Sequence, residues 1–345
     1  MRPGGERLLL SLADRRNDRA MKRVSLVFGL MMLAASGSAE ERAWRLGVLT
    51  PFDWPADISM HNVMLPELAR RGFVEGRNLV VIPRWGSVSD LDKLTQLAQD
   101  LAAAKPDVII AVSPFAISAA MKAAPQTPIV ASFTTDPVIE GEAASLSRPG
   151  GKVTGVAMLS FDGDRKRFEL LHEAIPTAHK FGYLTYRRLT LTYRRLTEKD
   201  NVRRAAIDLG VEIVSYKLHG SSEYLPAFDA MRDAHVDALV IGSSPVFHRD
   251  AAQLATFAQE RRLPTICEWR EMASSGCLVG YGPDLAELRL RTADFVARLF
   301  AGGNPAEMPF EQPTHFATAI NNKVAHAIGI TLPTEILIRA DEVIE

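Results

Sequence analysis

Polar side chains follow two apolar runs in the first half of the chain. Ser113 ends the run 107–113, and Thr135 and Asp136 lie just beyond the run 127–133. If both runs are strands of one parallel sheet, these side chains meet beyond the strand ends, where N–H groups at helix starts also converge on a ligand. Hydroxyls and helix amino termini suit a carboxylate, whereas the aspartate suits an ammonium. Serine and aspartate also cap helices, so a structural role stays open for both.

Comparable positions occur at the ends of apolar runs in the second half of the chain. Glu268 is a candidate partner for an ammonium, and Trp269 a candidate ring wall. Ser243 and Ser244 offer hydroxyl donors. Aromatic side chains at strand ends also pack within a lobe, and this alternative stays open. The candidate ligand-binding residues are Thr50, Phe52, Ser113, Thr134, Thr135, Asp136, Tyr186, Ser243, Ser244, Glu268, Trp269 and Tyr281.

Catalytic and metal-binding motifs are missing at the spacings they require. His172 and Glu173 are followed by His179 rather than by a histidine at zincin spacing, and Pro176 interrupts the helix. No Walker loop, nucleophile elbow or dinucleotide glycine pattern occurs where a strand meets a helix. We therefore expect no catalytic residue, no metal and no cofactor. The alternative is an exported α/β enzyme, such as a hydrolase, that uses one of the candidate carboxylates as a general base.

The elements that must carry these residues alternate between strand and helix. Short, branched apolar runs indicate buried parallel strands, and segments such as 64–72 and 91–104 have the three- and four-residue spacing of helices. Two such series, joined near residues 150–155, predict an α/β fold with two doubly wound lobes of parallel sheet around a central cleft. The expected strands are 45–50, 78–83, 107–113, 127–133, 180–186, 211–218, 237–243 and 264–269, and the expected helices of the second series are 164–174, 198–208, 223–234 and 248–262.

Composition and charge agree with two lobes and narrow the range of partners. The 345 residues are roughly twice the usual size of one folding unit. Hydrophobic residues make up 47% and charged residues 23%, as in soluble globular proteins. Lys and Arg number 40 against 41 Asp and Glu, so no domain-wide positive field is available to hold a phosphate backbone. We therefore expect no nucleic-acid partner.

The amino-terminal 39 residues resemble a leader that contains a secretory signal at about 21–39. Basic residues at 22–23 precede the apolar run 24–35, and the small residues 37–39 follow it. That run is too short to span a bilayer, which takes about 20 apolar residues. No cysteine follows the small residues, so the sequence predicts a soluble, periplasmic mature chain without a lipid anchor. Residues 1–20 are polar and charged, unlike the n-region of a signal, so a start at Met21 is an alternative to Met1.

Several longer segments resemble one protein family. They are RGFVEGRNLVV at 71–81, TDPV at 135–138, RPGGKVTGV at 148–156, EWREMASSGCLVGYGPD at 268–284 and LPTEILIRADEVIE at 332–345. Together they are similar to the periplasmic substrate-binding proteins of ABC transporters, in the subgroup that includes tryptophan- and tyrosine-type binders. The resemblance runs from about residue 45 to residue 345.

This resemblance implies a type I periplasmic-binding fold whose two lobes are joined by three hinge crossings. It implies that a helix near 285–301 returns to the first lobe and that the last segment joins the second. The first lobe would then comprise residues 40–158 and 283–303, and the second 159–282 and 304–345. It also implies that the chain captures a small molecule, such as an amino acid or related carboxylate. A membrane permease and an ATPase would be its partners, and we expect a monomer.

Two local features have open interpretations. The heptapeptide LTYRRLT occurs twice in succession, at 184–190 and 191–197. The second copy either lengthens a surface loop or places arginines near the cleft, and Tyr193 could take the place of Tyr186.

Cys267 and Cys277 could pair in an oxidising compartment or remain as buried thiols.

Overall fold

The computed structural model describes residues 42–50, 57, 59–86, 91–158, 163–186 and 192–345. The expected leader and the candidate Phe52 lie outside these residues. The side chain of Thr134 is also outside the described part. Within the described residues, no helix combines the length and the apolar character needed to cross a bilayer.

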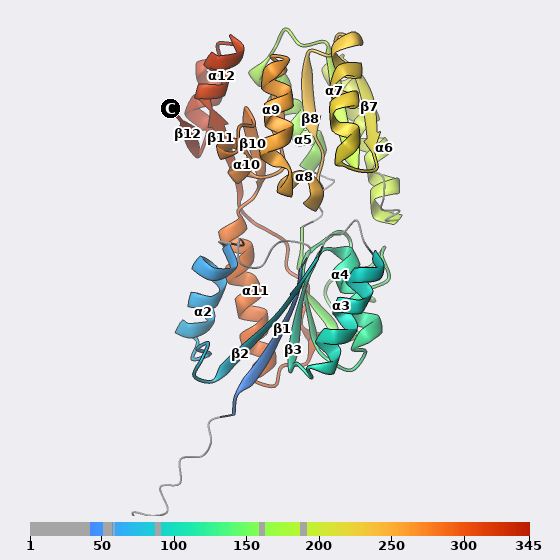
Figure 1. Cartoon of the computed structure of the whole chain (residues 1–345), viewed down its shortest axis with the longest axis vertical. Helices are drawn as coiled ribbons and strands as arrows, with labels where there is room; N and C mark the ends of the chain where they lie inside the picture. Colours follow the sequence, from blue (N-terminus) through green and yellow to red (C-terminus); the bar gives the residue numbers. More distant parts are fainter. Residues whose placement is uncertain (1–41, 51–56, 58, 87–90, 159–162, 187–191) are drawn as a thin grey trace, which may run out of the picture. The chain divides into compact units, whose positions relative to one another are not determined.

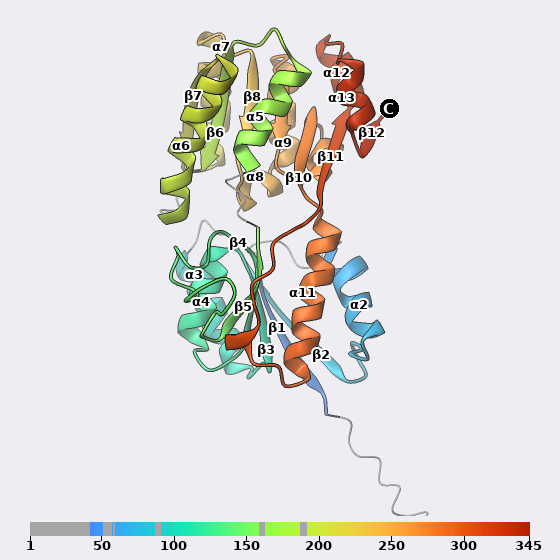
Figure 2. The same ribbon diagram turned by 180° about the vertical axis from the view of Figure 1, so that it is seen from behind.

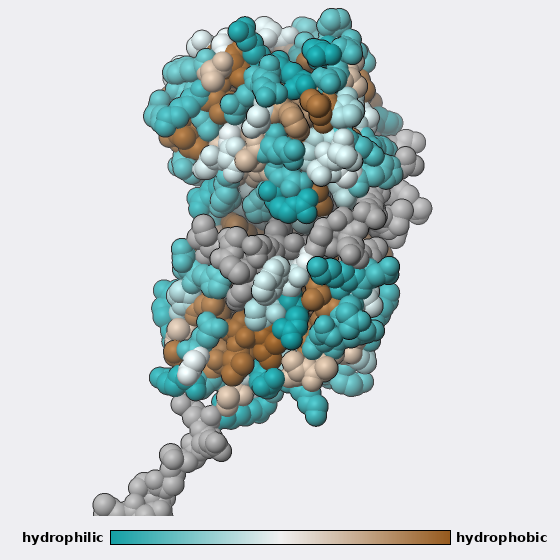
Figure 3. All heavy atoms as spheres, viewed as in Figure 1, coloured by the Kyte–Doolittle hydropathy of each residue, from teal (hydrophilic) through white to brown (hydrophobic). Residues whose placement is uncertain are grey.

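Five parallel strands form the sheet of the first lobe, in the order β2-β1-β3-β4-β5. The central strand β3 is buried along its whole length because helices cover both faces of the sheet, and its sequence is an unbroken apolar run. Strand β2 is an edge strand, and apolar surface gathers near it (Figure 3), including the exposed side chains of Val80 and Trp85. The strands are β1 (Trp44–Thr50), β2 (Leu79–Trp85), β3 (Val108–Val112), β4 (Ile129–Thr134) and β5 (Val153–Ala157).

Helices from distant parts of the sequence cover the two faces of this sheet. Figures 1 and 2 show α3 and α4 on one face, and α2 with α11 on the other. Helix α11 starts at the cap Asp284, which accepts a hydrogen bond from the amide of Glu287. The helix expected near 285–301 is present, and it packs against α2 and β5. The elements are η2 (Met60–Met64), α2 (Leu65–Arg70), α3 (Leu91–Ala103), α4 (Pro114–Ala123), α11 (Leu285–Phe300) and η5 (Pro305–Glu307).

Seven strands form the sheet of the second lobe, in the order β12-β11-β10-β9-β8-β6-β7. All neighbours are parallel except β10 and β11, which pair antiparallel. The sequence patterns predict four of these strands. The strands are β6 (Lys180–Tyr186), β7 (Glu212–Leu218), β8 (Ala238–Ile241), β9 (Thr265–Cys267), β10 (Val279–Pro283), β11 (Phe316–Asn321) and β12 (Glu342–Ile344).

The helices of the second lobe also form two layers. One layer contains α5, α6, α12 and α13, and the other contains α7, α8, α9 and α10 (Figures 1 and 2). The predicted helix 248–262 consists of two helices that meet at Asp250. The helices are α5 (Gly163–Ala174), α6 (Thr192–Leu209), η4 (Ser221–Glu223), α7 (Tyr224–Asp233), α8 (Pro245–Arg249), α9 (Ala251–Glu260), α10 (Arg270–Ser274), α12 (Asn322–Ile328) and α13 (Thr334–Arg339).

The duplicated heptapeptide is divided between two elements. The first copy supplies the end of β6, so Tyr186 keeps the strand position, and the second copy supplies the start of α6, with Tyr193 in that helix. Helix α6 therefore begins six residues before the predicted helix at 198–208. The side chains of residues 192–199 are outside the described part of the structure.

The hydrogen bonds of residues 304–311 bear on one predicted lobe boundary. Residues 304–311 were assigned to the second lobe, but they bond to the first, and Figure 2 shows this segment running along the first lobe before β11. The Gly150 amide donates to the Ala306 carbonyl at 3.0 Å, and the Thr154 hydroxyl donates to the Met308 carbonyl at 2.7 Å. We propose that the first lobe comprises 43–158 and 283–311, and the second 163–282 and 316–345.

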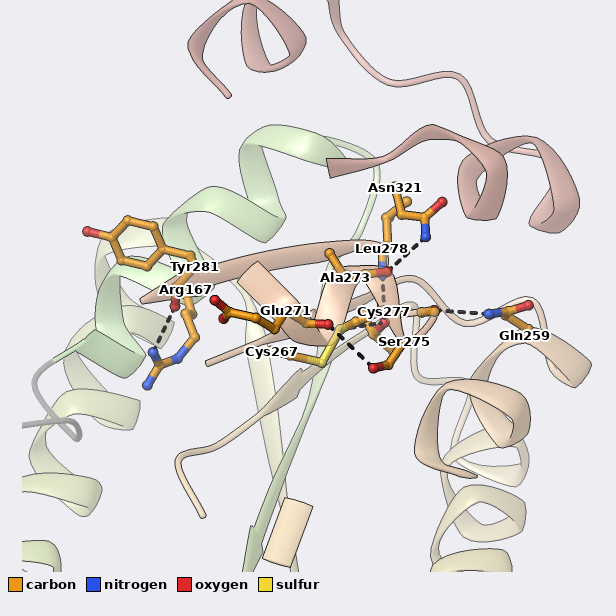
Figure 4. The surroundings of a disulfide bond; sticks show 12 residues. Arg167, Gln259, Cys267, Glu271, Ala273, Ser275, Cys277, Leu278, Tyr281 and Asn321 are labelled. Atoms are coloured by element: carbon orange, nitrogen blue, oxygen red, sulfur yellow. Dashed lines mark hydrogen bonds between the residues drawn. A yellow bond between two sulfur atoms is a disulfide. The ribbon is translucent and has the colours of Figure 1, made fainter. Parts of the chain in front are cut away.

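A disulfide joins Cys267 at the end of β9 to Cys277, just before β10 (Figure 4). It closes the loop that contains α10. Two further bonds hold this loop: the Gln259 side chain donates to the Gly276 carbonyl at 2.9 Å, and the Asn321 side chain donates to the Ala273 carbonyl at 2.8 Å. The open question about the two cysteines is thus decided in favour of pairing.

Two glycines of β10 let this loop lie directly against the strand. A Cβ on Gly282 would sit 1.9 Å from the Glu268 carbonyl oxygen, and one on Gly280 would sit 2.4 Å from the Trp269 carbonyl oxygen. Because strand side chains alternate between faces, Tyr281 points the opposite way. The sequence GYG therefore allows close backbone contact on one face and an aromatic side chain on the other.

We expect Gly282→Ala to lower the free energy of unfolding by about 1–3 kcal/mol, because the new methyl group must displace backbone. Gly151→Ala is the matched control, since a Cβ there meets nothing within 4 Å. Urea unfolding of both variants measures the difference. Equal stability of the two variants would show that the close approach is absent.

Replacing both cysteines by serine should destabilise the oxidised protein by about 3 kcal/mol, because the bond closes a short loop of the unfolded chain. Thiol titration of the unfolded wild-type protein should find no free thiol before reduction. Two free thiols in protein exported to an oxidising compartment would contradict the pairing.

Candidate functional site

In the first lobe, Thr135 carries the clearest sign of a binding role. It follows β4, and its side chain is 5% exposed. Its hydroxyl oxygen is buried without a hydrogen-bond partner among the described residues. A buried hydroxyl without a partner costs free energy, and a bound polar group would remove that cost. Thr50, another candidate, is fully buried at the end of β1.

Ser113 occupies a strained backbone position next to this strand end. Its φ is 88° and its ψ is 150°, a region that residues other than glycine rarely adopt. The side chain caps α4 by accepting a bond from the Ala116 amide at 3.4 Å, and the Ser113 amide donates to the Ser132 carbonyl of β4 at 3.2 Å. The cap role that the sequence left open is therefore present, at a position typical of strained binding loops.

The Asp136 carboxylate stabilises its own loop. One of its oxygens accepts the amides of Val138 and Ile139 at 2.9 and 3.1 Å. This is the capping geometry that aspartate favours at turns and helix starts. These hydrogen bonds are those of the structural role that the sequence left open for Asp136.

The second lobe contains a buried ion pair at the start of α5. Asp164 and Arg167 are each 1% exposed, and a guanidinium nitrogen lies 2.6 Å from a carboxylate oxygen. Arg167 also donates to the Ser243 hydroxyl at 2.8 Å and to the Tyr281 carbonyl at 3.1 Å. The Tyr183 hydroxyl donates to the other Asp164 oxygen at 2.5 Å. The guanidinium thus links α5 to β10 and to the residues that follow β8.

Charge balance keeps this arginine protonated. Burial alone would lower the pKa of Arg167, but the carboxylates of Asp164 and Glu268 raise it above its ordinary value. Asp164 also lies in the first turn of α5, where the helix dipole favours a negative charge. Arg167 therefore keeps its charge inside the lobe, where several hydrogen-bond partners surround it.

Sequence reasoning missed this pair. In the sequence, the pair is visible only as an Asp and an Arg three residues apart, after the predicted lobe junction. Such pairs usually lie on solvated helix surfaces, and sequence spacing does not report burial.

A cavity of about 320 Å³ lies beside the ion pair. Two predicted residues, Glu268 and Tyr281, line it together with Arg167. Figure 4 shows Arg167 and Tyr281 side by side, next to the disulfide loop. Burial raises the pKa of the Tyr281 hydroxyl, so this group is neutral at ordinary pH. Acidic, basic and aromatic groups therefore meet at one place in the second lobe.

Other second-lobe candidates have structural partners. The Tyr186 hydroxyl donates to the His219 carbonyl at 2.9 Å, and its ring packs edge-on against Phe247. Ser244 caps α8 by accepting the Val246 amide at 3.2 Å. Trp269 is buried, with its ring centroid 6.0 Å from that of His248. Among the described residues, no three His, Cys, Asp or Glu side chains are placed to hold a metal ion.

This chain is similar to known proteins in sequence and in structure. A tyrosine-binding protein of Clostridioides difficile (strain R20291) is 26% identical over 264 residues, which cover 76% of this chain and 74% of the relative. A conserved domain protein from Vibrio cholerae is similar in structure, with a TM-score of 0.80 and 22% identity over 88% of this chain and 100% of that one. An ABC domain in complex with L-Trp from Streptococcus pneumoniae has a TM-score of 0.79 and 21% identity over the same shares.

These structural similarities confirm the predicted α/β fold with two lobes, the type I periplasmic-binding fold. One of the relatives is a tyrosine-binding protein. A family model described as ABC transporter substrate binding protein matches residues 47–344, which is most of the chain. The chain therefore belongs to the ABC transporter substrate binding protein family.

Proposed function

We propose that this protein captures an amino acid between its lobes and delivers it to the permease of an ABC transporter. The observation that carries the proposal is the buried Thr135 hydroxyl, which has no partner among the described residues and lies at a strand end. In parallel α/β folds this is where ligands bind. Tyrosine and tryptophan are the first solutes to test, because one relative is a tyrosine-binding protein and a similar structure holds L-Trp.

The first lobe supplies hydrogen-bond donors that suit a carboxylate. The Thr135 hydroxyl can donate to an anionic group, and the dipole of α4, whose first turn Ser113 caps, favours a negative charge near the helix start. Thr50 is a further hydroxyl at a neighbouring strand end. Because the Asp136 carboxylate is committed to loop amides, we assign the solute's ammonium to a group of the second lobe instead.

The second lobe supplies that group. Glu268 is 5% exposed and lines the cavity beside Arg167, and Ser243 lies within the same hydrogen-bonded cluster. Solute contacts to both lobes favour a closed arrangement of the hinge. The permease then distinguishes the solute-bound protein from the empty one.

We also propose where the protein acts and which partners it has. The amino-terminal signal exports the chain, and the mature protein acts outside the cytoplasm as a monomer. Its membrane partners are a permease and an ATPase. The protein needs no cofactor and catalyses no reaction.

We expect Thr135→Val to weaken binding of L-tyrosine or L-tryptophan by about 10- to 100-fold, because a hydrogen bond to a charged group contributes about 1.5–3 kcal/mol. The same change should leave the empty protein equally stable or slightly more stable, since a methyl group replaces a buried hydroxyl that has no partner. Calorimetric titration and thermal unfolding of residues 40–345, freed of solute by refolding, measure both effects.

Asp136→Asn is the matched control, because asparagine keeps an oxygen that can accept the loop amides. Its affinity should stay within about twofold of wild type. A large loss of affinity in Asp136→Asn, with no loss in Thr135→Val, would show that Asp136 rather than Thr135 contacts the solute. Failure of every amino acid to raise the unfolding temperature would argue against the proposed function itself.

A further inference from the structure

In the described part of the chain, three segments pass between the two sheets. The first follows β5, the second lies between β10 and α11, and the third precedes β11. Helix α11 packs against β3, β4 and β5 of the first sheet, so each passage has one end on the first lobe. The relative movement of two lobes depends on how such segments are held.

Glu287 joins the second passage to the third. It lies in the first turn of α11, where the second passage ends. One of its carboxylate oxygens accepts the Thr314 hydroxyl at 2.7 Å, and the other accepts the His315 amide at 3.1 Å. The Asp284 amide also donates to the His315 carbonyl at 3.1 Å, and Figure 2 shows the chain before β11 passing the start of α11. Side-chain and backbone bonds thus hold these two passages together.

Arg291 connects this contact to the first passage. It follows Glu287 by one turn of α11, and its guanidinium donates to Glu287 at 2.7 Å and to Glu311 at 2.6 Å. The Glu311 backbone is bonded to β5: its amide donates to the Gly155 carbonyl and its carbonyl accepts the Ala157 amide, both at 2.9 Å. Glu311 is therefore fixed to the strand end from which the first passage leaves.

The charges of this cluster stabilise one another. Burial alone would raise the pKa of Glu287, but hydrogen bonds from Thr314 and Arg291 lower it below its ordinary value. The hydrogen bond to Glu287 in turn raises the pKa of Arg291. Both groups are therefore ionised at neutral pH.

The cluster gains strength because its members are shared. Arg291 and its two carboxylate partners are between 22% and 35% exposed, and an isolated ion pair at such exposure contributes little. Arg298, which is also paired with Asp294, lies 3.9 Å from Glu311 and adds a second cation. Because the members hold one another in place, ordering one lowers the cost of ordering the next.

We propose that this cluster acts as a hinge brace, which holds the first-lobe ends of the three passages together. The hinge brace consists of Glu287, Arg291, Glu311 and Thr314. Segments that are tied at one end cannot slide past one another, so movement between the lobes is confined to bending on the second-lobe side of the brace. These are positioning residues, which act on the geometry of the hinge rather than on the solute. The inference goes beyond the proposed function and holds for any solute.

Glu287→Ala tests the hinge brace by hydrogen exchange of solute-free residues 40–345. Alanine keeps the helix but removes the carboxylate on which the brace is built. The amides of Asp284 and Glu311 donate to backbone carbonyls rather than to Glu287. They should nevertheless exchange at least about tenfold faster than in wild type, because charge-assisted bonds no longer resist local opening. Amides of β3 should exchange as in wild type.

Glu67→Ala is the matched control. Glu67 is also a carboxylate on a first-lobe helix with two arginine partners, Arg70 at 2.6 Å and Arg71 at 2.8 Å, and its side chain is 16% exposed against 22% for Glu287. Both arginines lie at the end of α2 rather than in a passage. The amides of the two passages should exchange at the wild-type rate in this variant.

Spin labels measure the effect on the lobes themselves. They are attached to Gln99→Cys in α3 and Ile207→Cys in α6, two exposed positions on different lobes. The native cysteines are paired, so the label reacts with the introduced ones. The distribution of distances between the labels should be broader in Glu287→Ala than in wild type or in Glu67→Ala.

Thr314→Ala removes a single hydroxyl link from an exposed position and decides the question if Glu287→Ala does not fold. The amides of Asp284 and Glu311 should then exchange about threefold faster, the range of one neutral hydrogen bond.

Wild-type exchange of these two amides in both brace variants, or an unchanged distance distribution, would overturn the hinge brace. Equal acceleration in Glu67→Ala would overturn it too, because the effect would then come from a loss of stability of the whole lobe. None of these measurements uses a solute. Failure of the hinge brace therefore leaves the proposed function standing, and failure of every amino acid to bind leaves the hinge brace standing.

Discussion

The buried Asp164–Arg167 pair is the contact on which the architecture of the second lobe's site depends. Arg167 bonds to Asp164, to the Ser243 hydroxyl and to the Tyr281 carbonyl. Removal of either charge would leave the other buried without its main partner, which typically costs about 3–5 kcal/mol. The pair thus fixes the start of α5 relative to β10 and to the end of β8, and these are the elements that surround Glu268.

A second constraint fixes the position of Glu268 itself. The disulfide holds both ends of the α10 loop, and Gly280 and Gly282 let its backbone lie against β10. Close packing of this kind leaves the segment 268–270 little freedom. Preorganised polar groups lose less entropy when a ligand binds, so the rigidity of this corner contributes to affinity as well as to stability.

The sequence predicts most of the fold because buried parallel strands have a strong local signature. The segment Val108–Val112 is apolar throughout, Ile129–Thr134 is mostly apolar, and both are strands in the structure. By contrast, residues 304–311 have no such periodicity, and long-range bonds join them to β5 and to the segment before it.

The site is less predictable than the fold for a physical reason. Position at a strand end is a local property, and it is what makes Thr135, Glu268 and Tyr281 candidates. Burial and partners are tertiary properties, so the sequence could not reveal that Arg167 is inside the lobe or that the Tyr186 hydroxyl bonds to a backbone carbonyl.

Titration of L-tyrosine and L-tryptophan into solute-free residues 40–345 tests the central claim most directly. The account predicts saturable binding of one solute per chain, with a negative heat-capacity change from apolar surface buried in the site. No saturable heat with either solute or with any other amino acid, at concentrations up to about 1 mM, where binding would contribute only about 4 kcal/mol, would contradict it.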